Sequence, residues 1–363
     1  MPVMTGLSGN EIYCLHLKGM RPGEIVVGNS VFSMGFVGSL GAGVNTFMGG
    51  EVTQVTAIVH EGRTEAYRRM AHEAAQRGGA GITGVTNELT RFHGNVEFLS
   101  IGSCVHKEGR PQGEAVGFSS SADGQELYCQ LDCGFQPKQF VFGNIAYSVG
   151  AAGGIIGTLK SMGRGEVKEF SDVFNRTRHI CLERIVEGAR QAGANAVVGI
   201  ETRIMDFQGV HEMMMLGTAS YHPLLPEVRG QHPITSDLTN QEMWNMAAMG
   251  YLPLKLVLGT AVYSLGVVGG LKAAFKSMSR GEISDLTTLV YDAREHAIGL
   301  IRQEAQALGA DDVVGIKTKI HEFGNLIEFM AIGTAVVKIP GAKPMTDTLP
   351  AQAIIRDKDT WIS

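Results

Sequence analysis

One unit is repeated three times along this chain, and this repetition limits what the chain can fold into. Four sets of three identical residues share two spacings, 115 residues from the first copy to the second and 116 from the second to the third. Repeats of this length are too long for a solenoid unit and suit a small domain repeated in tandem. The sets are Gly28, Gly143 and Gly259; Glu51, Glu166 and Glu282; Arg63, Arg178 and Arg294; and Gly84, Gly199 and Gly315.

The three units and their connections cover most of the 363 residues. The connecting segments, 107–124 and 222–237, are rich in Pro, Gly, Ser and charged residues, as linkers are. The units are predicted at residues 10–106, 126–221 and 241–338, with a C-terminal tail at residues 339–363.

The composition is that of an ordinary globular protein, with 44% hydrophobic and 18% charged residues and a net charge of −5. This mild acidity argues against nucleic-acid binding, which favours a basic face. No apolar run reaches the roughly 18 residues of a membrane-spanning helix. The first residues, Met1 to Met4, lack the pattern of a secretory signal. Because five cysteines form no even framework, we expect a reduced, cytoplasmic protein.

Each unit shows the same order of elements, which is clearest in unit two. A strand rich in Val, Phe, Ile and Tyr is predicted at 139–149, and a long helix follows with Ser171 or Asp172 as its N-cap. Gly193 stands where a helix often ends in a left-handed residue, as do Gly78 and Gly309. Strands are predicted at 196–206 and 212–221. A helix with one apolar face needs a sheet to cover it. The sequence therefore predicts an α+β fold of three two-layer units, each strand–helix–strand–strand with a mainly antiparallel sheet.

A carboxylate precedes each long helix, at Glu51, Glu166 and Glu282. Each follows a glycine, and a negative charge at that place favours the positive N-terminal end of the helix. The alternative is a carboxylate that binds a metal or a substrate. Both interpretations stay open at the level of the sequence, with the helix-end role favoured.

A second carboxylate recurs inside the apolar last strand of each unit, and a half-buried carboxylate requires a partner. An arginine near the start of each long helix is the natural candidate. We predict ion pairs within a unit or across a subunit boundary, and we favour a structural or interface role over a catalytic one. The predicted pairs are Arg63 with Glu97, Arg178 with Glu212, and Arg294 with Glu328.

Metal ligation and catalysis receive little support from the repeats. The weak metal candidates, His211, Glu212, Cys129 and Cys133, are confined to unit two. A closed zinc site needs four ligands at known spacing. No Ser–His–Asp or Cys–His grouping recurs in the units, so nucleophilic catalysis is not indicated. We therefore predict no enzyme activity and no cofactor, and a divalent or heavy metal remains an alternative.

The unit resembles the YbjQ family, which carries a heavy-metal-binding label. Unit one is the most divergent and has Ser103-Cys104 where Thr-Ala is usual. The resemblance implies single units that assemble as closed pentamers in a β/α propeller-like arrangement, and it transfers no catalytic residue. It rests on Lys160 to Glu166, Arg178, Gly193 to Ile200 and Leu216 to Ala219 in unit two, and on Lys276 to Glu282, Leu308 to Gly315 and Ile332 to Ala335 in unit three.

These observations predict a ring-forming, non-enzymatic scaffold or binding platform. The alternative is a protein that binds a metal or small ligand through acidic sites at unit interfaces. Closed cyclic symmetry is the usual outcome for soluble oligomers. We expect a homo-pentamer stacked as three rings of five units, and its rival is a six-unit ring made by two chains. The C-terminal tail is a candidate binding site for a protein partner.

Overall fold

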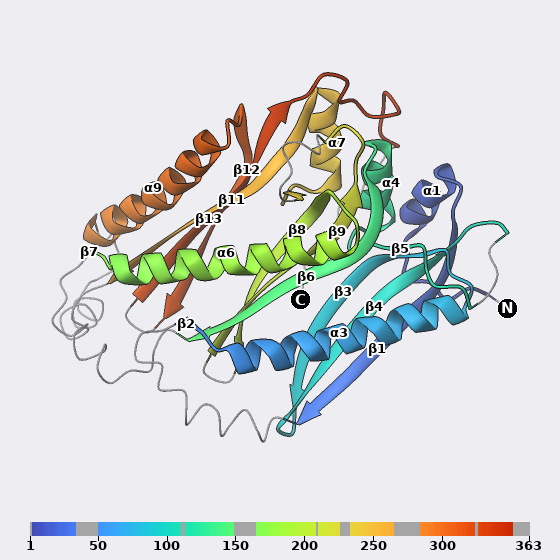
Figure 1. Ribbon diagram of the computed structural model, residues 1–363, viewed down its shortest axis with the longest axis horizontal. Helices are drawn as coiled ribbons and strands as arrows, with labels where there is room; N and C mark the ends of the chain where they lie inside the picture. Colours follow the sequence, from blue (N-terminus) through green and yellow to red (C-terminus); the bar gives the residue numbers. More distant parts are fainter. Residues whose placement is uncertain are drawn as a thin grey trace, which may run out of the picture.

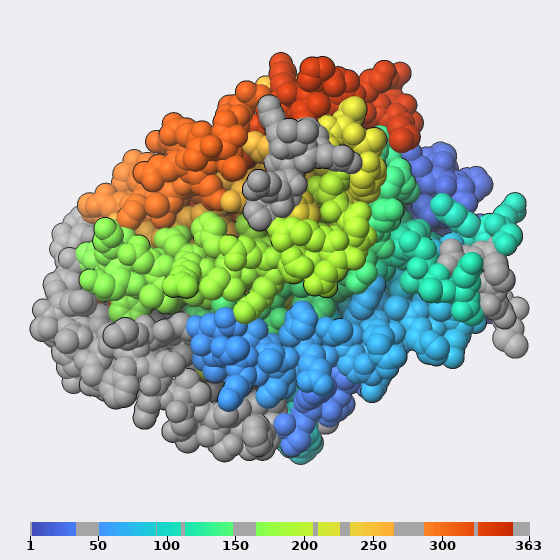
Figure 2. Space-filling model, viewed as in Figure 1, coloured from blue at the N-terminus to red at the C-terminus, as the bar shows by residue number. Residues whose placement is uncertain are grey.

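Three sheets, each covered by one long helix, lie side by side in the chain (Figure 1). The computed structural model describes residues 2–33, 50–109, 113–148, 165–207, 210–225, 233–264, 284–323 and 326–350. In these ranges no helix is long and apolar enough to cross a membrane. The three long helices form adjacent bands on one face of the molecule (Figure 2). The predicted fold, three α+β units, is confirmed.

Each unit contains a short helix, a long strand, a long helix and a final hairpin of two long strands. Two-residue strands lie before two of the long helices and within both connecting segments. Unit one has α1 (Gly9–Leu17), β1 (Arg21–Ser33), β2 (Gly50–Glu51), α3 (Thr53–Gln76), β3 (Gly81–Phe92) and β4 (Asn95–His106), followed by β5 (Phe118–Ser119). Unit two has α4 (Gly124–Asp132), β6 (Gln136–Ser148), β7 (Gly165–Glu166), α6 (Lys168–Gln191), β8 (Ala196–Phe207) and β9 (Val210–Tyr221), followed by β10 (Ile234–Thr235). Unit three has α7 (Asn240–Ala248), β11 (Tyr251–Ser264), α9 (Ser284–Ala307), β12 (Asp312–Phe323) and β13 (Leu326–Lys338).

The short helix at the start of each unit was not predicted from the sequence. Its N-cap residues are Ser8, Asp123 and Thr239, whose side chains accept hydrogen bonds from backbone N–H groups of the first turn. In α1 and α7 the cap and a glutamate three residues later form a capping box. This spacing of Ser or Thr and Glu was the available sequence signal for both helices.

The long helices end where the sequence predicts, and α6 begins earlier than predicted. Gly78, Gly193 and Gly309 have φ angles of 72°, 65° and 65°, which confirms the left-handed C-terminal glycines. The predicted N-cap of α6 is wrong, because the helix begins at Lys168 and its N-cap has no side-chain hydrogen bond. The Ser171 hydroxyl instead accepts a hydrogen bond from the backbone N–H of Val262, in unit three, at 2.9 Å.

Neighbouring units exchange strands. Strand β2 of unit one pairs with β6 of unit two, and β7 of unit two pairs with β11 of unit three. The predicted linkers also contain strands, because β5 pairs in parallel with β3 and β10 pairs in parallel with β8. Both connections therefore extend the sheet of the preceding unit before they enter the next one.

The units are consequently joined laterally, and the predicted stack of three rings is wrong. That stack placed each unit of one chain in a different ring. The structure instead relates unit one to unit two, and unit two to unit three, by the same side-by-side joint. The apolar cores confirm the lateral arrangement, because one cluster combines α6 residues such as Ile185 with unit-three residues such as Leu258 and Met330.

Candidate functional site

The joint between units two and three contains a fully buried ion pair. The Arg178 guanidinium, on α6, donates to the Glu328 carboxylate, on β13, from Nε at 3.1 Å and from Nη2 at 2.7 Å. Both side chains have an exposed fraction of 0%. Nη2 also donates to the Tyr147 hydroxyl at 2.8 Å. Such a pair is costly to break, because removing one partner leaves a buried, uncompensated charge.

The joint between units one and two repeats this arrangement. The Arg63 guanidinium, on α3, donates from Nη2 to the Glu212 carboxylate, on β9, at 2.9 Å, and both side chains are fully buried. Arg63 Nη1 donates to the Asn87 side-chain oxygen at 2.6 Å. The predicted partners were therefore displaced by one unit. In both joints the arginine pairs with the carboxylate of the following unit, because the long helix packs on the first strand of that unit and the glutamate lies on the adjacent last strand.

The carboxylates that precede the long helices also bind the neighbouring unit. Glu51 pairs with Arg184 of unit two at 2.7 Å, and Glu166 lies 3.3 Å from the His296 ring of unit three. Glu282 lies outside the described residues. Two of the three members of this set thus contribute polar contacts to the joints.

The remaining glutamate lies in unit one, and the remaining arginine lies in unit three. Glu97 of unit one is partly exposed, and its carboxylate accepts a hydrogen bond from the Asn29 side chain at 3.0 Å. Arg294 of unit three is exposed. The predicted pair of Arg294 with Glu328 does not form, because Arg178 occupies the Glu328 carboxylate. The same displacement leaves Glu97 without Arg63, which binds Glu212.

The pair at the second joint has one unsatisfied donor. Within the described residues, Arg178 Nη1 and the Thr202 hydroxyl are both buried without a hydrogen-bond partner. Thr202 occupies the position of Asn87 in unit one, and the longer Asn87 side chain reaches its arginine. At this acceptor position the two joints thus differ by the length of one side chain.

We expect Thr202→Asn to raise the free energy of unfolding by about 1–2 kcal/mol. The new amide oxygen would accept from Arg178 Nη1, and hydrogen bonds to charged groups are typically of this size. Urea denaturation followed by circular dichroism measures the change. Thr202→Val, which keeps the shape and supplies no acceptor, is the control. Equal stabilities of the Asn and Val variants would contradict the expectation.

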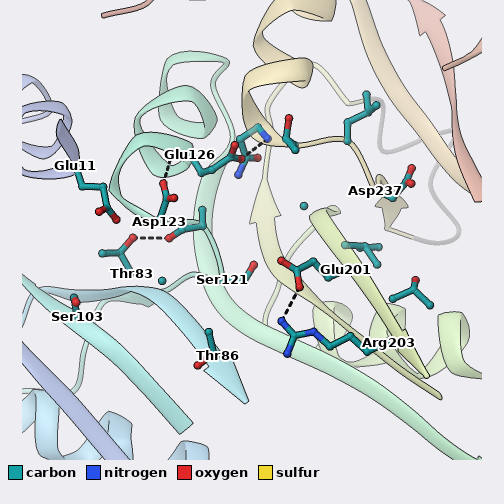
Figure 3. Close-up of a pocket in the computed structure, with 18 of the residues that line it drawn as sticks. Glu11, Thr83, Thr86, Ser103, Ser121, Asp123, Glu126, Glu201, Arg203 and Asp237 are labelled. Carbon is teal, nitrogen blue, oxygen red and sulfur yellow. Dashed lines mark hydrogen bonds and ion pairs between the residues drawn. The ribbon is translucent and has the colours of Figure 1, made fainter. Parts of the chain in front are cut away.

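A polar cavity of about 720 Å³ lies where the three units meet. It is lined by inward positions of β3, β8 and β12 and by the segments that lead into the short helices. Figure 3 shows the carboxyl groups of Glu11, Asp123, Glu126 and Asp237 around this space, together with the Glu201–Arg203 ion pair. Lys317 and Lys319 complete its charged lining.

Some of the charged side chains around the cavity pair with one another or with backbone groups. Lys319 Nζ donates to the Thr202 carbonyl at 2.7 Å, and Lys317 Nζ lies 3.5 Å from the Asp237 carboxylate. Burial lowers the pKa of Lys319 and raises the pKa of Asp237. The cavity is therefore a mixed acidic and basic environment in which ionised side chains are partly desolvated.

Glu126 is the most perturbed carboxyl group of this cavity. Burial raises its pKa from the ordinary value of 4.5 to about 7, and the nearby Asp123 carboxylate adds to the rise. The backbone N–H of Asn240 donates to it at 2.5 Å and opposes the rise. The Glu11 carboxylate accepts in the same way from the backbone N–H of Gly124, at 3.2 Å. Each contact fastens one short helix to the next.

We expect the wild type to lose stability as the pH rises from about 4.5 to about 7. Glu126→Gln should remove this pH-dependent loss. In that window the folded protein keeps the Glu126 proton and the unfolded chain releases it. The wild type is therefore penalised above the window, on the order of 2–3 kcal/mol at pH 8. Glutamine cannot ionise and can still accept from Asn240. Denaturation at pH 4.5 and pH 8 measures the change, and a pH-independent difference between the two proteins would refute it.

The predicted metal candidates do not converge. Within the described ranges no three His, Cys, Asp or Glu side chains are grouped so that they could hold a metal ion. Cys129 and Cys133 are buried in an apolar cluster, where burial raises the pKa of the Cys133 thiol. The Glu212 carboxylate is engaged by Arg63, and the His211 ring lies 5.6 Å from the Tyr147 ring. These residues do not supply the donor set of a thiolate or imidazole site.

Comparison with known proteins gives the same division of the chain into three units. The family model YbjQ_1, described as "Putative heavy-metal-binding", matches residues 18–108, 135–222 and 246–338. The chain belongs to the YbjQ family. It contains three YbjQ units, and the family description names a metal for which the described residues of this chain provide no grouped ligands.

Relatives of this YbjQ protein include one long chain and many single units. The Encapsulin nanocompartment protein Rv1762c of Mycobacterium tuberculosis is 34% identical over 229 residues, which cover 59% of this chain and 84% of the relative. A UPF0145 protein of Pseudothermotoga lettingae is 42% identical over 84 residues, covering 23% of this chain and 79% of the relative. A UPF0145 protein of Methanocella arvoryzae is 34% identical over 96 residues, covering 26% and 78%.

Proposed function

We propose that this YbjQ-family protein is a non-enzymatic scaffold or binding platform that assembles with copies of itself into a closed ring. The observation that carries the proposal is the joint, which the chain builds twice with the same buried Arg–Glu pair. A joint that links unlike surfaces propagates head to tail, and it ends only when the assembly closes. The repeated charged residues thus serve to join units rather than to perform chemistry.

A ring of two chains and six units follows best from the lateral arrangement. Because the units of one chain stand side by side, each chain contributes three consecutive units to the ring. Inward residues of all three units, such as Thr86, Glu201 and Lys317, line one cavity of about 720 Å³. The arc is therefore tightly curved, which favours a small number of units. Two chains are the smallest number that can close a ring around such a cavity. We therefore propose the six-unit ring of two chains in place of the pentameric stack.

Three further observations support a scaffold that works with partners in the cytoplasm. The M. tuberculosis relative is named as an encapsulin nanocompartment protein, which points to work alongside an assembly of proteins. The start of the tail is anchored, because Thr346 donates from its hydroxyl to the Asp132 carboxylate at 2.7 Å. We propose that a protein partner binds the tail beyond this anchor. All five cysteines are buried and free, as a reducing compartment favours.

Mass photometry of the purified chain tests the scaffold directly. The expected species is twice the chain mass of 38.9 kDa. Larger multiples would keep the scaffold and reject the six-unit ring. A single species at the mass of one chain, persisting at micromolar concentration by sedimentation, would overturn the scaffold itself.

The cavity favours a second candidate function, the binding of a metal ion or small ligand where the units meet. Asn240 has an exposed fraction of 2%, lines the cavity, and its side-chain oxygen has no hydrogen-bond partner within the described residues. With the Glu126 and Asp237 carboxyl groups it offers acceptors to a cation or to a ligand with N–H or O–H donors. Metal analysis of the purified protein tests the ion, and a thermal-shift screen of metabolites tests the ligand. Asn240→Ala should abolish any hit.

A further inference from the structure

We infer that unit three of one chain binds unit one of a second copy, and that Arg294 then forms a buried ion pair with Glu97 of that copy. The inference rests on the proposed function and names the surfaces through which it is achieved. Arg294 stands at the position of Arg63 and Arg178, and Glu97 stands at the position of Glu212 and Glu328. The two formed pairs have exposed fractions of 0%, whereas Arg294 is exposed and Glu97 is partly exposed. Units one and three thus carry the two complementary halves of the joint.

Apolar side chains on β1 of unit one are also exposed where their equivalents in a formed joint are buried. In the joint between units two and three, Leu256, Leu258 and Val262 of β11 are buried, with exposed fractions of 0%, 2% and 0%. Their equivalents on β1 are exposed. The exposed fractions are 41% for Ile25, 43% for Val27 and 52% for Val31.

Unit three carries the receiving surface. A groove of about 290 Å³ between α9 and β12 is lined by Ile298, Ile301 and Ile316. Ile316 is 44% exposed, whereas its equivalents Ile200 and Val85 are 3% and 1% exposed, because the following unit covers them. The groove of unit three is therefore apolar, like the surfaces of the other two units that a following unit covers. The exposed residues of β1 occupy the positions that would cover it.

The open edge of β12 matches the first residues of the chain. In the two completed joints, Phe118 pairs with Gly81 and Ile234 pairs with Ala196, in parallel. The repeat spacing puts Val3 at the position of Phe118 and Asp312 at the position of Gly81. Val3 and Met4 are 50% and 72% exposed, so the segment is accessible to the β12 edge of another copy. Parallel pairing there satisfies backbone groups that an edge strand leaves open.

The short helices provide an independent sign that the surfaces of units three and one are complementary. At the first joint Lys18 pairs with the Asp132 carboxylate at 2.6 Å. The equivalent positions at the open joint are Met249 of unit three and Leu17 of unit one, which are 58% and 46% exposed. Both members have changed together from charged to apolar. This agreement favours a second copy of the same chain over an unrelated partner.

Charge reversal tests the assignment. Arg294→Glu and Glu97→Arg should each weaken association by at least about 30-fold, because each places like charges in a desolvated joint. A one-to-one mixture of the two variants should recover association, because a dimer of one chain of each kind has the native pair at one joint and the reversed pair at the other. The double variant should also recover association, with the reversed pair at every joint. Sedimentation velocity over a concentration series measures the change. Arg68→Glu, on the 67% exposed side chain of α3, is the control with the same change of charge.

Each outcome of this experiment bears on the inference. If the wild type assembles and the Arg294 and Glu97 variants behave like the Arg68 control, the inference is overturned and the scaffold stands. A monomeric wild type overturns both. A chain truncated after Pro350 should assemble unchanged, and its failure to do so would assign the β12 edge to the tail. Circular dichroism establishes that each variant is folded, which we expect because both side chains are accessible in the single chain.

Discussion

Replacing Glu328 with leucine lowers the free energy of unfolding by about 3–5 kcal/mol. The Arg178 guanidinium loses its carboxylate partner while both positions remain at an exposed fraction of 0%. An uncompensated charge inside the joint either stays desolvated or admits water between units two and three, and both are costly. Urea denaturation followed by fluorescence and far-ultraviolet circular dichroism measures the loss.

A matched pair of variants separates the buried charge from the general effect of a substitution. Glu201→Leu removes a carboxylate that pairs with Arg203 at 2.8 Å but is 61% exposed, and we expect a change of at most about 1 kcal/mol. The double variant Arg178→Met with Glu328→Leu should lose less stability than Glu328→Leu alone, because no isolated charge remains. A Glu328→Leu variant as stable as Glu201→Leu would contradict the assignment of the pair as the centre of the joint.

Gly28→Ala is expected to cost about 3 kcal/mol or more, because overpacking at a backbone contact has no side chain to displace. A Cβ atom at Gly28 would overlap the carbonyl oxygen of Ala66 and the amide nitrogen of Met70, on α3. At the equivalent Gly143, a Cβ would lie 2.5 Å from the Cys181 carbonyl oxygen. The repeated glycine thus lets each long helix lie directly on the first strand of its unit. The expected consequence is displacement of α3 from β1.

Gly188→Ala is the control, since its Cβ would meet only the Val141 side chain, at 3.5 Å. Gly188 lies inside α6, where alanine is favoured over glycine by about 1 kcal/mol. The control should therefore be as stable as the wild type or more stable. Thermal and urea denaturation of both variants measure the contrast. A Gly28→Ala variant with wild-type stability would show that the helix and strand can separate at little cost.

Much of the fold of one unit could be predicted from the sequence because its signals are local. Helical spacing of apolar residues located α6, and the left-handed glycine at Gly193 located its end. The start of α6 could not be predicted from Ser171, because that hydroxyl binds the backbone of Val262 in the next unit. The composition of the connecting segments predicts linkers and contains no sign that β5 and β10 add to a sheet.

The repeats alone establish that three related units exist and that each carries an arginine on its long helix and a glutamate in its apolar last strand. A charge in such a strand needs a partner, because an unpaired buried charge is costly. Which copy supplies the partner of each arginine follows only from the fold of the whole chain. Glu212 was an equally suitable partner for Arg178, but α6 packs laterally on β11, and Glu328 lies on the adjacent strand β13. The residue types are the same for both choices of neighbour, so the outcome depends on how the units pack.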